Sequence, residues 1–451
     1  MVEITMLETA QIFDNHPVLQ ETTRYKIKYL NTLEYFVRKY SAKDSWSAEA
    51  LQLYIRKFLG SKAETYTYDD FHLKKDASDV LAVKFKAFRF YSYRYSFLID
   101  CLFICAYADQ DKGEAILQEL ETFFLFFNKR DSKKSQQILS FLYQCDSNTA
   151  SIRNILQINY AVSCWDRNRK YIAQKPIRVL VTANMSAGKS TLINAMIGKK
   201  VNRTQNESCT AKIHRIVNKP FEDGFCYTYT DGLNLNAADE EIMQADQCLP
   251  GTEVMAGTHF RMTGMPSRRI WFIDTPGVNS SQDTEEKNLT EHTICHEEVD
   301  QLIYVMNGEN IGSTDDRKHL LFLLEHYHGN ILFLVNKLDH FRKEDSVLET
   351  LSAVQSDLSS MGFENPIVVP GSSYAAYLAK RKKFGEVLNE EEEEEYQRLM
   401  RKLSKTEYQF NTYYPRWAQQ IVHGAADPTT DPVLRHSGIL ELEVMIATGG
   451  N

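Results

Sequence analysis

The sequence predicts an α/β fold with a mainly parallel sheet, plus an all-α N-terminal region. From Lys175 onward, short apolar runs alternate with helical patterns, which is typical of a parallel sheet covered by helices. Before that point Pro17 is the only proline and glycine is nearly absent, while apolar residues recur three or four positions apart. We therefore expect two domains in the 451-residue chain, a helical one at residues 1–174 and an α/β one at residues 175–448.

The composition narrows the class of protein. With 43% hydrophobic and 25% charged residues, the chain is typical of globular proteins. We expect neither a membrane span nor a secretory signal, because no run of eighteen apolar residues occurs and the N-terminus lacks the basic and apolar segments of a signal. The eight cysteines form no CxxC pair, so reduced thiols explain them better than disulfides or zinc. A cytoplasmic location is therefore expected.

In the N-terminal region the apolar spacing predicts helices at residues 47–59, 83–108, 114–128 and 134–145, with breaks near residues 61–70, 109–113 and 131–132. Together they indicate a helical bundle or hairpin. Residues 88–95 interleave aromatic residues with arginines, a pattern found where proteins contact nucleic acid or membranes. A core helix whose arginines reach solvent explains the same run, and we favour that interpretation.

The α/β domain opens with a strand, a loop and a helix at residues 177–196. The loop fits the phosphate-binding pattern G-x-x-x-x-G-K-[ST], with Ala183 in place of the first glycine. Because N–H groups at a helix N-terminus hold phosphates, we expect Lys189 to reach the β- and γ-phosphates and Ser190 to bind Mg²⁺. A chance loop would also match, but the flanking strand and helix favour function. The predicted nucleotide contacts here are Asn184, Met185, Ala187, Gly188, Ser190 and Thr191.

A second motif follows a long polar region. Residues 212–218 and 224–230 are β-like, and we interpret residues 231–265 as loop with one short helix. An apolar strand at residues 269–273 then ends in Asp274-Thr275-Pro276-Gly277. A carboxylate at this place can hold Mg²⁺ through water, and the Gly277 N–H can sense a γ-phosphate. The order of the two motifs indicates a nucleotide-dependent switch.

A third motif, Asn336-Lys337-Leu338-Asp339, follows an apolar strand at residues 331–335. The Asp339 carboxylate can accept hydrogen bonds from the ring N–H and the exocyclic amine of guanine, a pair of donors that adenine does not offer. We expect Asn336 to brace the loop and Lys337 to lie along the base. The motif therefore predicts GTP and GDP as ligands.

The rest of the domain contains further predicted elements, which are strands at residues 301–306 and 366–369, helices at residues 315–326, 380–405 and 437–446, and a loop at residues 423–435. We expect a backbone N–H of Ser372 or Ser373 to contact the guanine carbonyl. The helix at residues 380–405 carries six consecutive glutamates, and we interpret it as a solvated surface helix.

In this order the three motifs resemble those of GTPases of the translation-factor-related class, and the chain resembles a bacterial dynamin-like protein. The loop Met185-Ser186-Ala187-Gly188-Lys189-Ser190-Thr191 is similar to the dynamin-type loop. About 86 residues separate Gly188 from Asp274, as in the enlarged dynamin G domain, and the terminal SGILELEVMI resembles the helix that leaves that domain. The resemblance covers residues 175–448.

The resemblance implies roles for further residues. Thr210 is the best match for the switch I threonine that binds Mg²⁺, with Thr204 as the runner-up. Ser186 stands where relatives place a residue near the transition-state charge or a bound monovalent cation. Lys189, Ser186 and Thr210 are therefore the catalytic candidates. Asp315 falls where dynamins use an aspartate across a dimer of G domains.

The resemblance also implies a nucleotide-dependent homodimer or a related GTPase partner, and peripheral attachment to a membrane surface. Dynamins continue into a helical stalk with a membrane-binding tip, whereas this sequence ends just after the G domain, so we expect either that a stalk has been removed or that the N-terminal helices do part of its work. Two residues depart from the family pattern. Ala183 fits only if its φ is negative. Met185 stands where eukaryotic dynamins carry a water-orienting glutamine, so hydrolysis is expected to be slow or to need backbone groups and a partner.

Two functions remain open at this point. The first is Mg²⁺-dependent hydrolysis of GTP, coupled to dimerisation and to the arrangement of the helical domain. The alternative, which Met185 favours, is a GTP-binding switch or scaffold with negligible hydrolysis. A third reading, an RNA- or ribosome-associated GTPase, is disfavoured by the net charge of −8 and the lack of a basic RNA-binding module. We expect no nucleic-acid partner.

Overall fold

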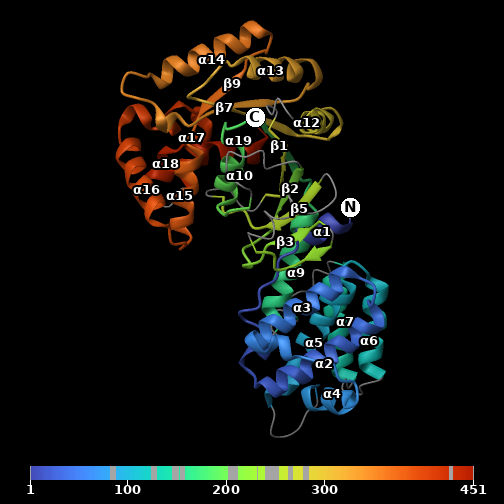
Figure 1. Cartoon of the computed structure of the whole chain (residues 1–451). Coiled ribbons are helices and arrows are strands. Elements are labelled where there is room, and N and C mark those ends of the chain that lie inside the picture. The colour runs from blue at the N-terminus through green and yellow to red at the C-terminus, as the bar shows by residue number, and fades with distance from the viewer. Residues whose placement is uncertain are drawn as a thin grey trace. The chain divides into compact units, whose positions relative to one another are not determined.

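The computed structural model describes residues 2–81, 88–122, 129–144, 152, 158–201, 212–230, 232–238, 253–262, 268–277, 284–425 and 430–449. Its contacts divide the chain into two units (Figure 1). The α/β unit comprises Met1–Glu8, Gln174–Asp231 and Ala237–Asn451, and the helical unit comprises Thr9–Ala173 and Gly232–Asn236. The contacts therefore place the first eight residues with the α/β unit, which the sequence did not suggest.

The helical unit is built around α5 (Phe88–Ala106), which packs against helices on several sides. Its other elements are η1 (Pro17–Gln20), α2 (Thr23–Tyr40), α3 (Ser45–Leu59), η2 (Gly60–Thr65), α4 (Leu73–Leu81), α6 (Gln110–Thr122), α7 (Lys129–Gln144), α9 (Asn159–Ile172) and the short strand β4 (Leu233–Asn234). Side chains of Thr22 and Asp44 cap α2 and α3, as expected for residues whose oxygen can accept from a first-turn N–H. The predicted helical region is confirmed, but the breaks predicted near residues 109–113 and 131–132 fall within α6 and α7, which begin at Gln110 and Lys129.

The aromatic and arginine run of α5 differs from its prediction. Arg94 does not reach solvent, because only 2% of it is exposed. Its Nη2 donates to Asp131 Oδ1 at 2.8 Å, and the Tyr95 hydroxyl donates to the same oxygen at 3.0 Å. Asp131 lies in the first turn of α7, so the pairing of opposite charges across two helices offsets the cost of burying the arginine.

A second buried polar network joins four segments of the helical unit at Asp100. The Asp100 carboxylate, 2% exposed, accepts hydrogen bonds from the hydroxyls of Tyr29 and Tyr54, at 2.5 and 2.9 Å. His16 Nε2 lies 2.9 Å from the same carboxylate, and His16 Nδ1 accepts from the Val18 N–H at 3.2 Å. His16 is therefore the tautomer that donates from Nε2 to Asp100.

We expect Asp100→Ala to destabilise the helical unit by about 3–5 kcal/mol, because three buried donors would lose their acceptor. Urea unfolding followed by tryptophan fluorescence measures this loss. Glu114→Ala is the matched control, since Glu114 is exposed and its loss should cost below about 0.5 kcal/mol. A cost below about 1 kcal/mol for Asp100→Ala would contradict the assigned network.

The sheet of the α/β unit is mainly parallel, as predicted. Its strands are β1 (Ile177–Ala183), β2 (Ile213–Asn218), β3 (Tyr227–Tyr229), β5 (Glu253–Thr258), β6 (Ile270–Asp274), β7 (Gln301–Asn307), β8 (Ile331–Asn336) and β9 (Ile367–Pro370). Within this unit they lie in the order β3-β5-β2-β6-β1-β7-β8-β9. Strands β6, β1, β7, β8 and β9 run parallel, whereas β2 is antiparallel to β6 and β3 to β5. The carboxyl ends of the five parallel strands share one edge of the sheet.

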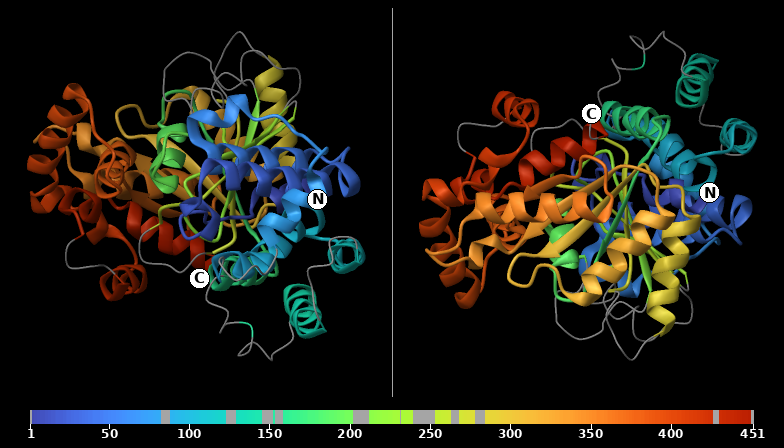
Figure 2. Two further views of the ribbon diagram at one scale, coloured as in Figure 1. Left: turned by 90° about the horizontal axis from the view of Figure 1, so that it is seen from below. Right: turned by 90° about the horizontal axis from the view of Figure 1, so that it is seen from above.

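Helices cover this sheet. They are α1 (Val2–Leu7), α10 (Lys189–Ile197), α12 (Thr284–His296), α13 (Thr314–His326), α14 (Val347–Met361), α15 (Ser373–Lys383), α16 (Glu390–Leu403), α17 (Arg416–Ala425), α18 (Pro432–His436) and α19 (Ile439–Thr448), with 3-10 turns η4 (Leu338–His340), η5 (Thr406–Tyr408) and η6 (Phe410–Tyr413). Helices α15 to α18 gather into one orange-red group in Figures 1 and 2. Helix α19 is buried from Ile439 to Ala447, consistent with its apolar sequence. In the part of the chain described, no helix is both long and apolar enough to span a bilayer.

Three predictions of secondary structure for this unit were wrong. Residues 253–258, predicted as loop, form β5, because β2 and β3 pair with its two sides and α1 packs against it. A Cβ added to Gly257 would lie 2.0 Å from the Leu7 carbonyl oxygen, so only glycine allows this close approach. The segment 253–258 thus owes its structure to its neighbours rather than to its own pattern.

The predicted single helix at residues 380–405 is two helices, α15 and α16. The chain turns at Gly385, whose φ is +80°, and α16 starts at an N-terminal capping box formed by Asn389 and Glu392. Nor is α16 a fully solvated helix, because Leu399 and Leu403 on one face are buried. The loop predicted at residues 423–435 likewise contains the end of α17 and most of α18.

Glu8 fixes the N-terminal segment to the α/β unit. Its buried carboxylate accepts from Arg269 Nε at 2.9 Å and Nη2 at 2.7 Å, and from Trp271 Nε1 at 2.6 Å. Such a two-pronged contact between guanidinium and carboxylate is geometrically specific. Both donors belong to β6 or precede it directly, so the N-terminal segment is held by the strand that ends in Asp274.

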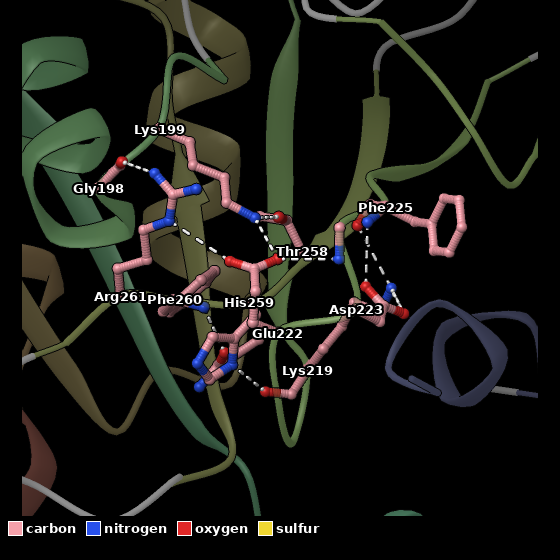
Figure 3. Close-up of polar contacts among 12 residues, drawn as sticks. Gly198, Lys199, Lys219, Glu222, Asp223, Phe225, Thr258, His259, Phe260 and Arg261 are labelled. Carbon is pink, nitrogen blue, oxygen red and sulfur yellow. Dashed lines mark hydrogen bonds and ion pairs between the residues drawn. The ribbon is translucent and has the colours of Figure 1, made fainter. Parts of the chain in front are cut away.

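The end of α10 farthest from the phosphate-binding loop is held by a polar cluster (Figure 3). Arg261 Nη1 donates to the Gly198 carbonyl at 3.0 Å. Lys199 Nζ donates to Glu222 Oε1 at 3.0 Å and to Thr258 Oγ1 at 3.2 Å. Cationic side chains near a helix C-terminus complement the helix dipole, so this cluster has a structural role in fixing α10.

His319 of α13 makes the α/β unit sensitive to acid. The ring is 3% exposed, its Nε2 lies 3.0 Å from Thr182 Oγ1, and burial lowers its pKa to about 4, with Lys287 adding to the effect. A lowered folded-state pKa means that the stability is fully present above pH 6.5 and is lost as the pH falls toward 4. At pH 5 we expect a loss of about 2 kcal/mol.

Urea unfolding at pH 7 and pH 5 measures this loss. His319→Gln should remove most of the pH dependence, whereas the same change at the exposed His326 of the same helix should leave it. An equal pH dependence in wild type and His319→Gln would contradict this assignment.

Candidate nucleotide-binding site

The phosphate-binding loop lies between β1 and α10. Gly188, with a φ of +91°, precedes the first residue of α10, and among the described residues no side chain caps that helix. Its first N–H groups therefore point at the space where the loop would hold an anion. Ser186 also has a left-handed φ of +61°, while Ala183 is not among the positive-φ residues, which confirms the condition under which alanine fits.

Lys189 and Asp274 form an ion pair at the carboxyl edge of the sheet. Lys189 is 7% exposed and Asp274 is fully buried. The pair forms because Asp274 ends β6 in register with Val181 of the neighbouring β1. A bound triphosphate would give Lys189 a new partner, and a bound cation would give one to Asp274.

Asn336 connects three loops. Its Nδ2 donates to the Ala187 carbonyl at 2.9 Å, and its Oδ1 accepts from the Ser373 N–H at 3.0 Å. Its carbonyl oxygen accepts from the Gly308 N–H at 2.8 Å. A Cβ on Gly188 would lie 2.4 Å from Asn336 Nδ2, so the glycine is required for this contact as well as for its φ. The first and third motifs are thereby joined directly.

Asp339 lies beside this junction and is 2% exposed. Lys337 precedes it in a left-handed conformation, with a φ of +63°, and turns the chain into η4. Among the described residues, Asp339 Oδ2 accepts no hydrogen bond, although His340 Nε2 and Arg398 Nη2 lie 3.4 and 3.6 Å away. A buried acceptor without a donor is costly, so Asp339 fits a ligand that brings N–H groups to it.

The loop after β9 differs from its prediction. The Ser372 N–H donates to the Ser437 carbonyl at 3.0 Å, and the Ser373 N–H is taken by Asn336. Neither N–H expected to meet a guanine carbonyl is therefore available in this arrangement. The Ser373 hydroxyl is buried without a hydrogen-bond partner in the described part of the chain, and it is the polar atom of this loop that a base could use.

Sequence reasoning missed Asp316. Asn184 Nδ2 donates to Asp316 Oδ1, which also accepts from the Tyr304 hydroxyl at 2.9 Å. Asp315, the residue singled out from the resemblance, is instead largely exposed and pairs with Lys318 at 3.4 Å. The signal for Asp316 was the Ser313 cap three residues before it, which directs this side chain inward at the start of α13.

The remaining predicted residues lie around the same edge. Met185 contacts Gly277, since a Cβ on Gly277 would lie 3.2 Å from Met185 Cγ, so the first and second motifs touch here too. Ser190 and Thr191 are half-buried in the first turn of α10. Thr210 and Thr204 lie outside the described residues. Their assignment to switch I stays a prediction.

The fold and the junction of the three loops define a P-loop GTPase domain. Known proteins specify the family: a model of the Dynamin family matches residues 179–338, so this part of the chain is a dynamin-family GTPase domain. The chain is also similar to bacterial dynamin-like proteins.

Two curated relatives show the extent of the similarity. The bacterial dynamin-like protein of Nostoc punctiforme is 27% identical over 192 residues, which are 39% of this chain and 26% of that protein. Dynamin-like protein A of Bacillus subtilis is 27% identical over 173 residues, 38% of this chain and 14% of that protein. The matched regions thus span about a quarter or less of these relatives. A solved structure of an oligomerised bacterial dynamin pair is 16% identical, covers 78% of this chain and 62% of that one, and has a TM-score of 0.34.

Proposed function

We propose that the protein binds GTP with Mg²⁺ at the junction of the three loops and hydrolyses it to GDP and phosphate. The observation that carries this proposal is that Asn336 bonds to Ala187 and Ser373 while Lys189 pairs with Asp274. These contacts gather, at one sheet edge, the three loops that we propose to hold the phosphates, the Mg²⁺ ion and the guanine base. The dynamin-family match supports the same nucleotide.

The residues present fit a magnesium nucleotide. Ser190 and Asp274 supply the hydroxyl and carboxylate oxygens that Mg²⁺ prefers, with Thr210 proposed as a further ligand. The ion would neutralise charge that develops on the phosphates. Lys189 and the N–H groups at the start of α10 would hold the phosphates, and Ser186 is proposed to lie near the transferring group. Positioning and charge stabilisation, rather than a side-chain base, would therefore accelerate attack by water.

A GTP-binding switch with negligible hydrolysis is the second candidate. It is favoured by Met185, whose thioether side chain neither orients nor deprotonates water. In this candidate the nucleotide changes the contacts of the second motif, which touches Met185 through Gly277, without turnover.

Single-turnover hydrolysis measured with and without K⁺, at several protein concentrations, separates the two. We expect a rate that increases with protein concentration, because we propose that the GTPase domain is completed by a second copy. A rate at the uncatalysed background under every condition would support the switch instead. Peripheral attachment to a membrane is a further proposal that rests on the family of residues 179–338, and co-sedimentation with liposomes tests it.

A further inference from the structure

Helix α16 brings an arginine to the guanine-reading carboxylate. Arg398 Nη2 lies 3.6 Å from Asp339 Oδ2, the buried oxygen that accepts no hydrogen bond among the described residues. Arg398 is separated from Asp339 in sequence by α14, β9 and α15. None of the three motifs includes it.

Arg398 is held in place by Glu395 of its own helix. Glu395 Oε2 accepts from Arg398 Nε at 2.8 Å and Glu395 Oε1 accepts from Nη2 at 2.5 Å, so both carboxylate oxygens engage the guanidinium. A planar guanidinium fixed in this way loses little freedom when it meets a second carboxylate. Arg398 is therefore oriented before any ligand binds.

The helix itself is fixed to the loop that follows Asp339. Lys402 Nζ donates to the Phe341 carbonyl and lies 4.6 Å from the centre of the Tyr408 ring. The Tyr408 hydroxyl in turn donates to the Arg342 carbonyl at 3.0 Å. Helix α16 thus lies along the base-reading loop.

The other end of α16 is tied to α15. Arg381 pairs with Glu392 at 2.6 Å and Lys382 with Glu393 at 2.8 Å. Helix α15 begins with Ser373, which bonds to Asn336. The acidic end of α16 therefore contacts the last turn of α15, and its basic end contacts the loop that follows Asp339.

We propose that Arg398 is a positioning residue for guanine recognition, which holds the Asp339 carboxylate in the orientation that accepts both N–H donors of the base. This inference rests on the proposed function. A buried carboxylate is costly unless a nearby positive charge compensates it. Without Arg398 the carboxylate would turn toward His340, whose Nε2 lies 3.4 Å from Asp339 Oδ2, and away from the base.

Titration of GDP and of xanthosine diphosphate (XDP) against purified variants tests the proposal. Arg398→Ala should weaken GDP binding about 5-fold, a size suited to a half-exposed ion pair. Arg398→Lys should restore part of the loss. Arg401→Ala, an exposed arginine on the same helix, is the matched control and should change affinity by less than about 1.5-fold.

The Asp339→Asn background distinguishes positioning from a merely structural role. An amide carries no charge for Arg398 to compensate, so adding Arg398→Ala there should leave XDP affinity nearly unchanged. An equal loss in both backgrounds, or no loss in either, would overturn the proposal. If instead Asp339→Asn itself left GDP binding intact, the proposed base site would be wrong, so the two failures are distinguishable.

Discussion

Replacing Lys189 with alanine should reduce GTP turnover by at least about 100-fold. The reason is electrostatic, since Lys189 is the charged side chain of the phosphate-binding loop and its ammonium group would stabilise charge on the transferring phosphoryl group. Its burial beside Asp274 makes this effect large, because water screens the charge poorly there. Steady-state release of phosphate from GTP measures the change.

Stability must be separated from catalysis in this variant. Removing Lys189 leaves the buried Asp274 without its ion-pair partner, and losing one member of such a pair costs about 3–5 kcal/mol. Thermal unfolding of the variant therefore accompanies the rate measurement. Lys200→Ala is the matched control, because Lys200 is exposed just beyond the end of α10. Undiminished GTP turnover in folded Lys189→Ala would contradict the assignment of the phosphate site.

Replacing Asp339 with asparagine should weaken GDP binding about 100-fold or more and shift preference toward XDP. Guanine offers two donors to the carboxylate, and hydrogen bonds to a charged group contribute about 1.5–3 kcal/mol each. An asparagine offers one acceptor and one donor, which matches the ring N–H and the carbonyl of xanthine. Competition with a fluorescent GDP analogue gives both affinities.

The control for this change is Asp345→Asn, which makes the same substitution on the same loop. Asp345 is exposed, and among the described residues its carboxylate accepts a hydrogen bond from the Arg342 N–H. We expect it to leave both affinities within about 2-fold. Equal binding of GDP by wild type and Asp339→Asn would show that Asp339 does not read the base.

The sequence predicted the centre of the site because its loops follow parallel strands. Apolar strands 177–183 and 331–336 could be recognised from their own residues, and parallel strands bring their carboxyl ends to one edge. Lys189 therefore meets Asp274, and Asn336 meets the phosphate-binding loop at Ala187. The roles of these residues toward a nucleotide stay predictions.

The contacts that the sequence did not predict are those set by tertiary packing. Nothing near Arg398 indicates that α16 would lie along the loop of Asp339. Asp316 follows the Ser313 cap, which turns its side chain inward, but only the fold brings Asn184 to it. Likewise, Glu8 is an ordinary acidic residue in the sequence, and its burial depends on Arg269, which lies far along the chain. Such partners have no local signal.

A crystal structure with Mg²⁺ and a non-hydrolysable GTP analogue tests the central claim most directly. The account predicts that the phosphates contact Lys189 and the start of α10, while the guanine edge contacts the Asp339 carboxylate. A nucleotide bound elsewhere, or one whose base lies away from Asp339 while its phosphates occupy the loop, would contradict it.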